Sequence, residues 1–307
     1  MKVKPVFTVF TPTYNRQEYL QLVYESLNKQ KLFHLFEWLI IDDGSTDNTS
    51  QFIKKIKKKS NFNINYFYQT NQGKHIAHNH AISKANGELV IFLDSDDQLL
   101  PNSISYLHRI WKKKNKKQKK EIAGFLGHCV DHNKKIIGSK WKHKSENEYL
   151  HFLIFYDLIV GEKIPIYRLD ILKNFLFPKL INDKIKFIPE GFVWLEISKY
   201  YKIQMLDLPI RIYNINTPGS LMSATKTYYS NPKGKKLLFD KLGEFLDIYK
   251  FKRFKYSLKI IIIISLLNII NKEKLFKFKK RYSTTLKFLF IITLPISFLK
   301  SLIEKLK

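Results

Sequence analysis

Residues 89–97 read LVIFLDSDD, a run of five apolar side chains followed directly by three aspartates and a serine. A short apolar run that ends in polar residues is typical of a buried strand. The same pattern occurs twice earlier, in VFTVF at 6–10 before TPTYNR, and in EWLII at 37–41 before DDGSTD. A fourth strand is expected at 64–68, and helical periodicity separates the strands. This alternation predicts a parallel α/β sheet with right-handed crossovers.

The polar clusters share one position relative to these strands. Each follows the carboxyl end of a strand, and ligands of open α/β sheets bind in the crevice beyond those ends. The sequence therefore predicts a single binding crevice, lined by residues 11–16, 42–47 and 94–97.

The charge of the chain suggests a polyanionic partner. Its 307 residues carry 54 Lys plus Arg and 26 Asp plus Glu, a net charge of +28. Only six of the basic residues are arginine, which base and phosphate recognition favours, so we predict no nucleic-acid partner. The single cysteine, Cys129, fits a reducing compartment. The first ten residues, MKVKPVFTVF, lack the apolar run of a secretory signal, and none is expected.

Four motifs follow one another along the chain: FTPTYNR at 10–16, IDDGSTD at 41–47, NQGKHIAHN at 71–79 and FLDSDD at 92–97. In this order and spacing the chain resembles the family-two glycosyltransferases with the GT-A fold, over about residues 4–215. The resemblance implies an α/β GT-A nucleotide-diphospho-sugar transferase fold with a Rossmann-like, mostly parallel sheet.

The domain organisation follows from the same resemblance. A GT-A catalytic domain is expected at 1–215, with a nucleotide half at about 1–100 and an acceptor half at about 101–215. A basic helical extension is expected at 216–307. The lysine-rich stretch 112–120 has no apolar periodicity and is expected to form a solvated loop.

The DSDD cluster is the candidate metal site. Asp94, Ser95 and Asp96 resemble the DXD element, which implies that Asp96 is a metal ligand and that Asp94 contacts the ribose or a metal-bound water. Clustered carboxylates repel one another unless a cation neutralises them, and Mg²⁺ or Mn²⁺ is the implied cofactor. Such a cation would bridge the donor phosphates and stabilise the departing diphosphate. The structural alternative is that Asp96 and Asp97 cap a helix near Pro101.

The first two motifs are the candidate nucleotide site. By resemblance Pro12, Tyr14, Arg16 and Asp43 bind the nucleotide sugar, with Tyr14 packing on the pyrimidine and Asp43 hydrogen-bonding it. An aromatic face and a carboxylate suit a flat ring with an N–H edge. The alternative for DDGSTD is an ordinary turn followed by a helix cap.

The third motif is the candidate phosphate loop. Gly73 admits close backbone approach, Lys74 could reach a phosphate, and Asn79 could hold either the loop or the sugar. Many relatives have arginine where this chain has His78, so a charged contact is not expected there.

Three histidines in the same motif suggest zinc as an alternative. Their spacings do not repeat on one helical face and no cysteine is nearby, so zinc is not favoured at His75, His78 and His80.

The acceptor hydroxyl needs a general base. Glu190, in IPEGFVW, is the candidate, with Trp194 lining the acceptor pocket and Glu196 as the fallback base. Gly191 stands where relatives have a second acid, and a helix N-terminus is the structural alternative for Glu190. Arg168 resembles a residue of the acceptor side in some bacterial members.

The carboxyl-terminal region is disproportionately basic, with 20 Lys or Arg and 5 Asp or Glu in residues 226–307. Its two uncharged stretches, 260–271 and 288–299, are too short to cross a bilayer, and Pro295 interrupts the second. Apolar segments beside lysine clusters, here KEKLFKFKKRY at 272–282, predict helices that lie on an anionic membrane surface. The alternative is a helical layer packed on the catalytic domain or on a second subunit, as in a homodimer.

The resulting prediction is a glycosyltransferase that moves a sugar from a nucleotide diphosphate sugar, with UDP favoured, to a glycan or a lipid-linked oligosaccharide. The resemblance implies inversion of the anomeric centre. We expect a cytoplasmic protein, peripheral on the inner face of the cytoplasmic membrane. One alternative is a nucleotidyltransferase, which would be expected to have a glycine-rich loop after the first strand; the segment PTYNR at that place is not such a loop. The other alternative is a non-catalytic basic module that binds nucleic acid or membrane.

Overall fold

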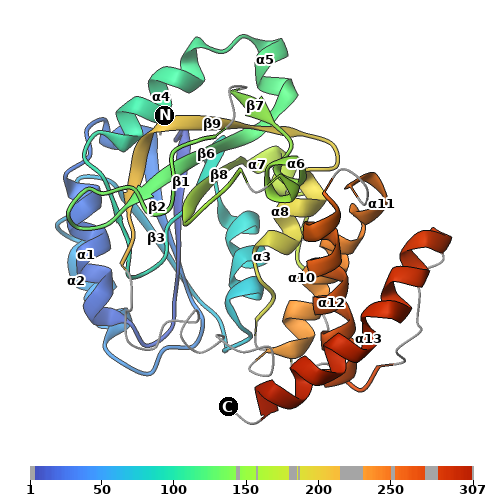
Figure 1. Cartoon of the computed structure of the whole chain (residues 1–307). Coiled ribbons are helices and arrows are strands. Elements are labelled where there is room, and N and C mark those ends of the chain that lie inside the picture. The colour runs from blue at the N-terminus through green and yellow to red at the C-terminus, as the bar shows by residue number, and fades with distance from the viewer. Residues whose placement is uncertain are drawn as a thin grey trace. The chain divides into compact units, whose positions relative to one another are not determined.

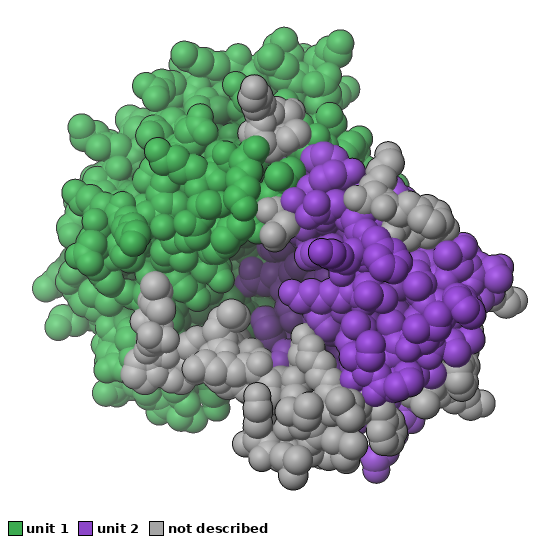
Figure 2. All heavy atoms as spheres, in the orientation of Figure 1, with its two compact units in different colours: residues 1–149, 158–179, 200–217 green, residues 150–157, 180–199, 218–307 purple. Residues whose placement is uncertain are grey.

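The computed structural model describes residues 4–142, 146–156, 158–179, 185, 187–214, 231–249, 253–273 and 283–305. The chain divides into two compact units (Figure 2). Unit 1 comprises residues 1–149, 158–179 and 200–217, and unit 2 comprises residues 150–157, 180–199 and 218–307. The expected boundary at 215–216 lies outside the described residues, and the division into a catalytic domain and an extension stays a prediction.

Unit 1 is an α/β unit (Figure 1). Its strands are β1 (Phe7–Thr13), β2 (Phe36–Asp42), β3 (Asn63–Tyr68), β4 (Leu89–Phe92), β5 (Gln98–Leu99), β6 (Ile122–Val130), β7 (Asn147–Glu148), β8 (Lys163–Arg168) and β9 (Lys202–Ile212). Its helices are α1 (Gln17–Asn28), the 3₁₀ turn η1 (Phe33–Leu35), α2 (Thr49–Lys57), α3 (Lys74–Lys84), α4 (Ser103–Lys113), α5 (Lys116–Glu121) and α7 (Leu169–Leu172).

All nine strands form one mixed sheet in the order β3-β2-β1-β4-β8-β6-β9-β5, with β7 on β9. The four strands of the amino-terminal half, β3, β2, β1 and β4, are parallel, as predicted. Beyond them β8 runs antiparallel to both β4 and β6, and β9 is parallel to β6. The α/β fold class is confirmed, and the parallel character is concentrated in the half that carries the motifs.

Successive side chains of a strand point to opposite faces of this sheet, and both faces are covered by helices. Phe7 and Val9 of β1 are fully buried in the main core, which also takes apolar residues from α1, α2 and α4. Phe10, on the other face, meets His78 of α3 at a ring-centroid distance of 5.1 Å. Figure 1 shows α1 and α2 on one side of the strands and α3 on the other. The strands that precede the motifs thus lie between α1 and α2 on one face and α3 on the other.

The prediction of a loop at 112–120 is wrong. Lys112 and Lys113 end α4, and residues 116–121 form the short helix α5. Asn115 caps α5, accepting a hydrogen bond from the Gln118 amide nitrogen, while the Gln118 side chain accepts one from the Asn115 amide. This capping box provides hydrogen-bond partners for the backbone amide groups of Asn115 and Gln118. The prediction of a loop was based on apolar periodicity, which does not detect such hydrogen bonds.

Unit 2 is helical. Its helices are α6 (Leu150–Phe155), α8 (Gly191–Ile197), α10 (Pro232–Gly243), α11 (Leu246–Tyr249), α12 (Phe254–Ile270) and α13 (Thr284–Lys305). A core of Leu195, Phe245, Ile261 and Phe290, with neighbours from the other helices, joins them. Within the described part of the chain, none of the helices has both the length and the apolar character required to span a membrane. Most of KEKLFKFKKRY, from 274 to 282, lies outside the described residues.

Candidate nucleotide-sugar and metal site

The motifs meet at one edge of the parallel half of the sheet. In the register of the strands, Thr13 at the end of β1 pairs with Asp42 at the end of β2, and Asp42 pairs with Tyr68 at the end of β3. The DSDD cluster follows β4, which is parallel to β1. The strand ends that carry the predicted motifs therefore lie side by side.

Hydrogen bonds tie the second motif to the first and to the third. Asn15 Oδ1 accepts a hydrogen bond from the Thr46 amide nitrogen at 2.7 Å. Asp43 accepts hydrogen bonds from the amide nitrogens of Gln72 at 2.9 Å and Gly73 at 2.8 Å. Gly73 has a φ of +92°, in the region that favours glycine, and it precedes the first turn of α3. The backbone conformation at Gly73 thus brings the third motif onto the second.

Ion pairs tie the fourth motif to the third and to the first. Lys74 Nζ lies 2.6 Å from Asp94 Oδ1, and Arg16 Nη1 lies 2.8 Å from Asp96 Oδ2. The four motifs, far apart in sequence, therefore form a closed ring of contacts. The two carboxylates of the DXD element each face one cation.

The two adjacent aspartates of the second motif have different surroundings. Asp42 is buried and accepts hydrogen bonds from the Tyr66 hydroxyl at 2.6 Å and the Ser45 amide at 2.8 Å. Asp43, 5% exposed, also accepts one from Gln69 Nε2 at 2.8 Å. Asp42 thus shapes the turn, and Asp43 shapes the loop of the third motif.

The remaining residues of the predicted nucleotide site lie along the same edge. Pro12 is in β1 beside Ile41, and Ser95 is buried next to Asp94. Tyr14 follows β1 and its side chain is 49% exposed, so its ring is accessible to a ligand.

Beneath the DXD element lies a buried ion pair that the sequence did not reveal. Arg211, near the end of β9, is 5% exposed, and its Nη1 lies 3.0 Å from Oδ2 of Asp97, which is fully buried. The Asn214 amide nitrogen donates to Asp97 Oδ1 at 3.1 Å. Burial raises the pKa of Asp97, although Arg211 opposes this change. The end of β9 therefore braces the loop that carries Asp94 and Asp96.

The aspartates suit a hard divalent cation. Asp94, Asp96 and Asp97 can each offer one carboxylate oxygen, and these oxygens lie within 4.8 Å of one another. Oxygen-only ligands match Mg²⁺ and Mn²⁺. Asp97 is fully buried against Arg211, whereas Asp94 and Asp96 are partly exposed, so Asp94 and Asp96 are the residues that could hold the ion. The alternative of a helix cap is not realised, since α4 begins at Ser103 after Asn102.

The third motif has a structural component. Asn79 pins the backbone of Phe177: its Nδ2 donates to the Phe177 carbonyl at 2.8 Å and its Oδ1 accepts from the Phe177 amide at 2.9 Å. This contact holds a segment distant from the third motif, and a role for Asn79 in binding the sugar stays a prediction.

The zinc alternative is not supported by the geometry. His78 is buried and stacks on Phe92 with ring centroids 4.6 Å apart, and His80 Nδ1 lies 2.9 Å from Gln69 Oε1. Within the described residues, Asp94, Asp96 and Asp97 form the one group of three or more His, Cys, Asp or Glu side chains that could hold a metal ion.

Arg168 lies away from this edge. In the register of the sheet it pairs with Leu89, the first residue of β4, while Asp94 follows the last. The separation along the strand is roughly 16 Å. Its guanidinium donates to the carbonyl of Lys119 at 2.6 Å and forms an ion pair with Asp170. Arg168 is thus not part of the nucleotide and metal site, and its acceptor-side role stays a prediction.

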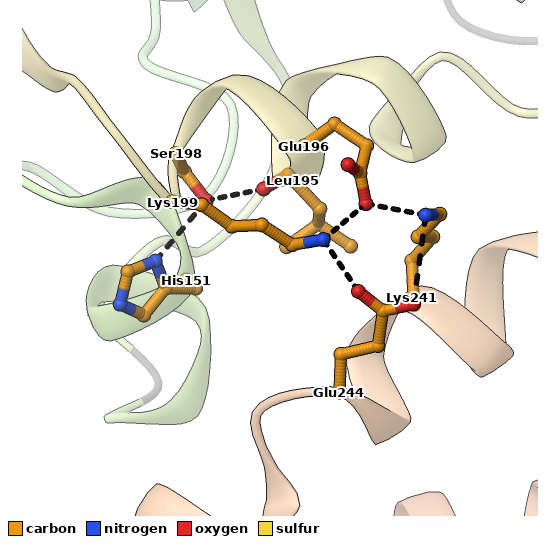
Figure 3. A network of polar contacts seen from close by, with 7 residues as sticks. All are labelled: His151, Leu195, Glu196, Ser198, Lys199, Lys241 and Glu244. Atoms are coloured by element: carbon orange, nitrogen blue, oxygen red, sulfur yellow. Dashed lines mark hydrogen bonds and ion pairs between the residues drawn. The ribbon is translucent and has the colours of Figure 1, made fainter. Parts of the chain in front are cut away.

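The candidate bases lie in unit 2. Glu190 is the N-cap residue of α8, and Trp194, in the same helix, is 7% exposed. Glu196 faces two cations, since its Oε1 lies 2.5 Å from Lys199 Nζ and also contacts Lys241 (Figure 3). Glu244 bridges the same two lysines. This four-residue network gives Glu196 a structural role and makes it a poor fallback base.

Arg211 and Asp97 are the residues that sequence reasoning missed. Arginine is scarce in this chain, and Arg211 stands within the apolar stretch LPIRIY. A charged residue in such a stretch is rarely buried without a partner. This signal was available, but it did not indicate which acid the arginine would meet.

Comparison with known proteins shows what the chain is similar to. Residues 8–155 match the model of the family described as glycosyl transferase family 2. The GalNAc(5)-diNAcBac-PP-undecaprenol beta-1,3-glucosyltransferase of Campylobacter jejuni is 28% identical over 233 residues, 73% of this chain and 70% of that protein. The poly(ribitol-phosphate) beta-N-acetylglucosaminyltransferase TarS of Staphylococcus aureus is 31% identical over 137 residues, but these cover 44% of this chain and 21% of TarS.

Solved structures support the fold. Residues 1–349 of S. aureus TarS in complex with UDP-GlcNAc superpose with a TM-score of 0.59 at 19% identity, covering 95% of this chain and 90% of that one. The mannosyltransferase PcManGT from Pyrobaculum calidifontis, in complex with GDP-Man and Mn²⁺, has a TM-score of 0.53 at 14% identity, covering 98% and 88%. Both likenesses indicate a common architecture.

Proposed function

Because the chain carries a glycosyl transferase family 2 domain, we propose that it transfers a sugar from a UDP-linked donor to a hydroxyl group of a glycan or lipid-linked oligosaccharide. The donor and acceptor classes are suggested by the relatives, one named as acting on an undecaprenol-linked glycan and another solved with UDP-GlcNAc. The family match favours a glycosyltransferase over a nucleotidyltransferase or a non-catalytic module.

The observation that carries the proposal is the ring of contacts among the four motifs. It gathers the groups that a nucleotide diphosphate sugar requires along one edge of the sheet. Tyr14 offers an exposed aromatic face for the base, and Asp43 lies beside the loop that would cover it. Arg16 and Lys74 are cations close enough to the DXD element to turn from carboxylates to phosphates.

Asp94 and Asp96 would hold Mg²⁺ or Mn²⁺. A divalent cation bound there supplies charge stabilisation for the departing diphosphate. Lys74 and Arg16, whose partners Asp94 and Asp96 would hold the ion, could pair with the donor phosphates instead of these carboxylates. Arg211 and Asn214 keep the loop in place by holding Asp97.

The reaction is a direct displacement. The acceptor oxygen forms a bond to the anomeric carbon, and its proton passes to a carboxylate that we propose to be Glu190. The bond from the anomeric carbon to the diphosphate breaks, and its electron pair leaves on the diphosphate oxygen. Attack opposite the leaving group inverts the anomeric centre.

The first test is turnover of a panel of nucleotide sugars, with and without EDTA. We expect UDP-sugar hydrolysis or transfer that needs Mn²⁺ or Mg²⁺ and that returns when the cation is restored after EDTA. Absence of turnover with every donor in the presence of metal would contradict the proposal.

The second test compares two glutamates of one helical region. Glu190→Gln should lower transfer by about a hundredfold or more, the usual cost of losing a general base, and leave UDP binding unchanged. The matched control, Glu196→Gln, should keep transfer within a few-fold because this side chain belongs to the lysine network. A result with the two variants exchanged would reassign the base.

We also propose that the protein works as a peripheral protein on the inner face of the cytoplasmic membrane, where a lipid-linked acceptor would be found. The basic composition of residues 226–307 supports this proposal.

A further inference from the structure

The last helix of the described chain has two faces. Leu286, Phe290 and Ser297 are buried, and Ser297 Oγ donates to the Ile262 carbonyl of α12 at 3.1 Å. The other face of α13 is apolar and exposed. Its large side chains have exposed fractions of 61% for Phe288, 47% for Ile291, 52% for Ile292 and 53% for Ile296.

The spacing of these four residues makes them one continuous surface. Positions i, i+3, i+4 and i+8 lie on the same side of an α-helix. We call Phe288, Ile291, Ile292 and Ile296 the α13 stripe. Contiguous exposed apolar residues of this kind mark a surface that binds something, whereas apolar residues scattered singly need no explanation.

The preceding helix shows the opposite arrangement. α12 is apolar around most of its circumference, and its isoleucines at 260, 261, 263 and 264 are all buried. A helix that is apolar all round is expected in a core. Of the two uncharged stretches for which a membrane contact was predicted, one therefore packs inside unit 2 and the other leaves a face open.

The charges close to the α13 stripe in the sequence indicate what covers it. Between positions 274 and 303 the sequence has seven Lys or Arg residues and not one Asp or Glu. Lys287 lies within α13, next to Phe288. A second copy of this +28 chain would bring an equally basic surface against the first, and like charges oppose such a contact. An anionic lipid surface attracts the lysines and accepts the apolar stripe.

Pro295 favours a helix that lies in the interface over one that crosses the membrane. It is on the exposed side of α13, and its ring nitrogen has no hydrogen to donate to the carbonyl of Ile291, four residues earlier. In the hydrocarbon core that carbonyl would lack a donor, while water and headgroups supply one at the interface.

We propose that α13 is the membrane-binding element of this protein, lying flat in an anionic bilayer surface with the α13 stripe inserted among the lipids. The proposal deepens the peripheral membrane association of the proposed function. Its test does not depend on catalysis.

The test is co-sedimentation of the full chain with vesicles of phosphatidylcholine mixed with phosphatidylglycerol, and with vesicles of phosphatidylcholine alone. We expect binding to the anionic vesicles that weakens with salt, and much weaker binding to the neutral ones. Phe288→Ser/Ile292→Ser should lower the partition coefficient on anionic vesicles at least about tenfold, because two large apolar side chains no longer enter the lipid.

The matched control removes equally exposed apolar residues elsewhere. Leu176 and Leu208, in unit 1, are 49% and 51% exposed, and Leu176→Ser/Leu208→Ser should sediment with vesicles as the unaltered chain does. Thermal unfolding of each variant confirms that it is folded. Ile291→Ser/Ile296→Ser, on the same stripe, provides a second variant should the first be unstable.

Three outcomes would overturn the proposal. Folded stripe variants could bind anionic vesicles as well as the unaltered chain, or the control variant could lose as much binding as they do. The third is that sedimentation velocity without vesicles shows a dimer that the stripe variants dissociate, which would make α13 an interface between copies. Hydrolysis of a UDP-sugar in solution, measured in parallel, reports separately on the proposed function and should be the same in all variants.

Discussion

The two edges of the sheet in unit 1 both hold buried or half-buried carboxylates, but they neutralise them in different ways. At the edge where β2 begins, Glu37 is 1% exposed and accepts four hydrogen bonds from uncharged donors. The donors are Thr8 Oγ1 at 2.6 Å, the Asn86 amide at 2.7 Å, Asn65 Nδ2 at 2.8 Å and Asn86 Nδ2 at 2.9 Å. At the opposite edge, Asp94 and Asp96 face Lys74 and Arg16.

The difference separates a structural carboxylate from the two that we propose to bind a metal ion. The donors to Glu37 are a backbone amide and short side chains, from β1, β3 and the connection between α3 and β4, and they cannot reach another partner as a long side chain can. Lys74 and Arg16 have long, flexible side chains that can turn from a carboxylate to a phosphate at small cost. A carboxylate held by movable cations remains available to a metal ion.

The largest expected effect is at the functional edge. Asp96→Ala should lower transfer roughly a thousandfold, since several kcal/mol of charge stabilisation depend on the cation. The measurement is turnover of a UDP-sugar at saturating Mn²⁺. Asp170→Ala, which removes an ion-paired carboxylate from beside Arg168, should turn over normally. Normal turnover by the Asp96 variant would remove the distinction between the two edges.

A smaller effect is expected at the structural edge. Glu37→Gln replaces one carboxylate oxygen, which accepts hydrogen bonds, by an NH₂ group, which donates them. The NH₂ group would then face the donors that now bind Glu37, and the free energy of unfolding should fall by about 3 kcal/mol. Urea denaturation measures this change. Turnover per folded molecule should be nearly unchanged, and a folded variant that no longer binds UDP would show that Glu37 has a role beyond structure.

The smallest effect concerns the movable cation itself. Lys74→Met should raise the KM for the donor about tenfold, the loss of one charge-assisted contact. The same change should strengthen Mn²⁺ binding without donor, because the competing ammonium is gone, and titration calorimetry would measure it. Lys236→Met, whose ammonium pairs with Asp240 in unit 2, is the control. Weaker Mn²⁺ binding by the Lys74 variant would mean that this lysine helps to hold the metal.

The nucleotide half of the fold could be predicted because its signals are local. Apolar runs such as EWLII and LVIFL coincide with β2 and β4, and each ends in the polar cluster that forms the site. The edge on which Tyr14, Asp43 and Asp96 meet follows from strand direction alone.

The other half of the sheet could not be predicted in this way. Its order is set by contacts between distant segments, as when β8 inserts antiparallel between β4 and β6. The same cause hides the partnership of Arg211 with Asp97. The apolar pattern also fails to predict the helix at 116–121. That helix has no apolar residue to pack, and reciprocal capping by Asn115 and Gln118 stabilises it instead.

The brace beneath the DXD element has a consequence for synthesis on the ribosome. Asn214, which holds Asp97, is 117 residues further along the chain, so all four motifs leave the ribosome long before it does. Until β9 joins β6, the growing chain must either keep Asp97 in water or bury it without its arginine, and the second is costly. The proposed site is therefore completed by β9, which follows all four motifs in the chain, and a chain released before β9 would carry every motif without a finished site.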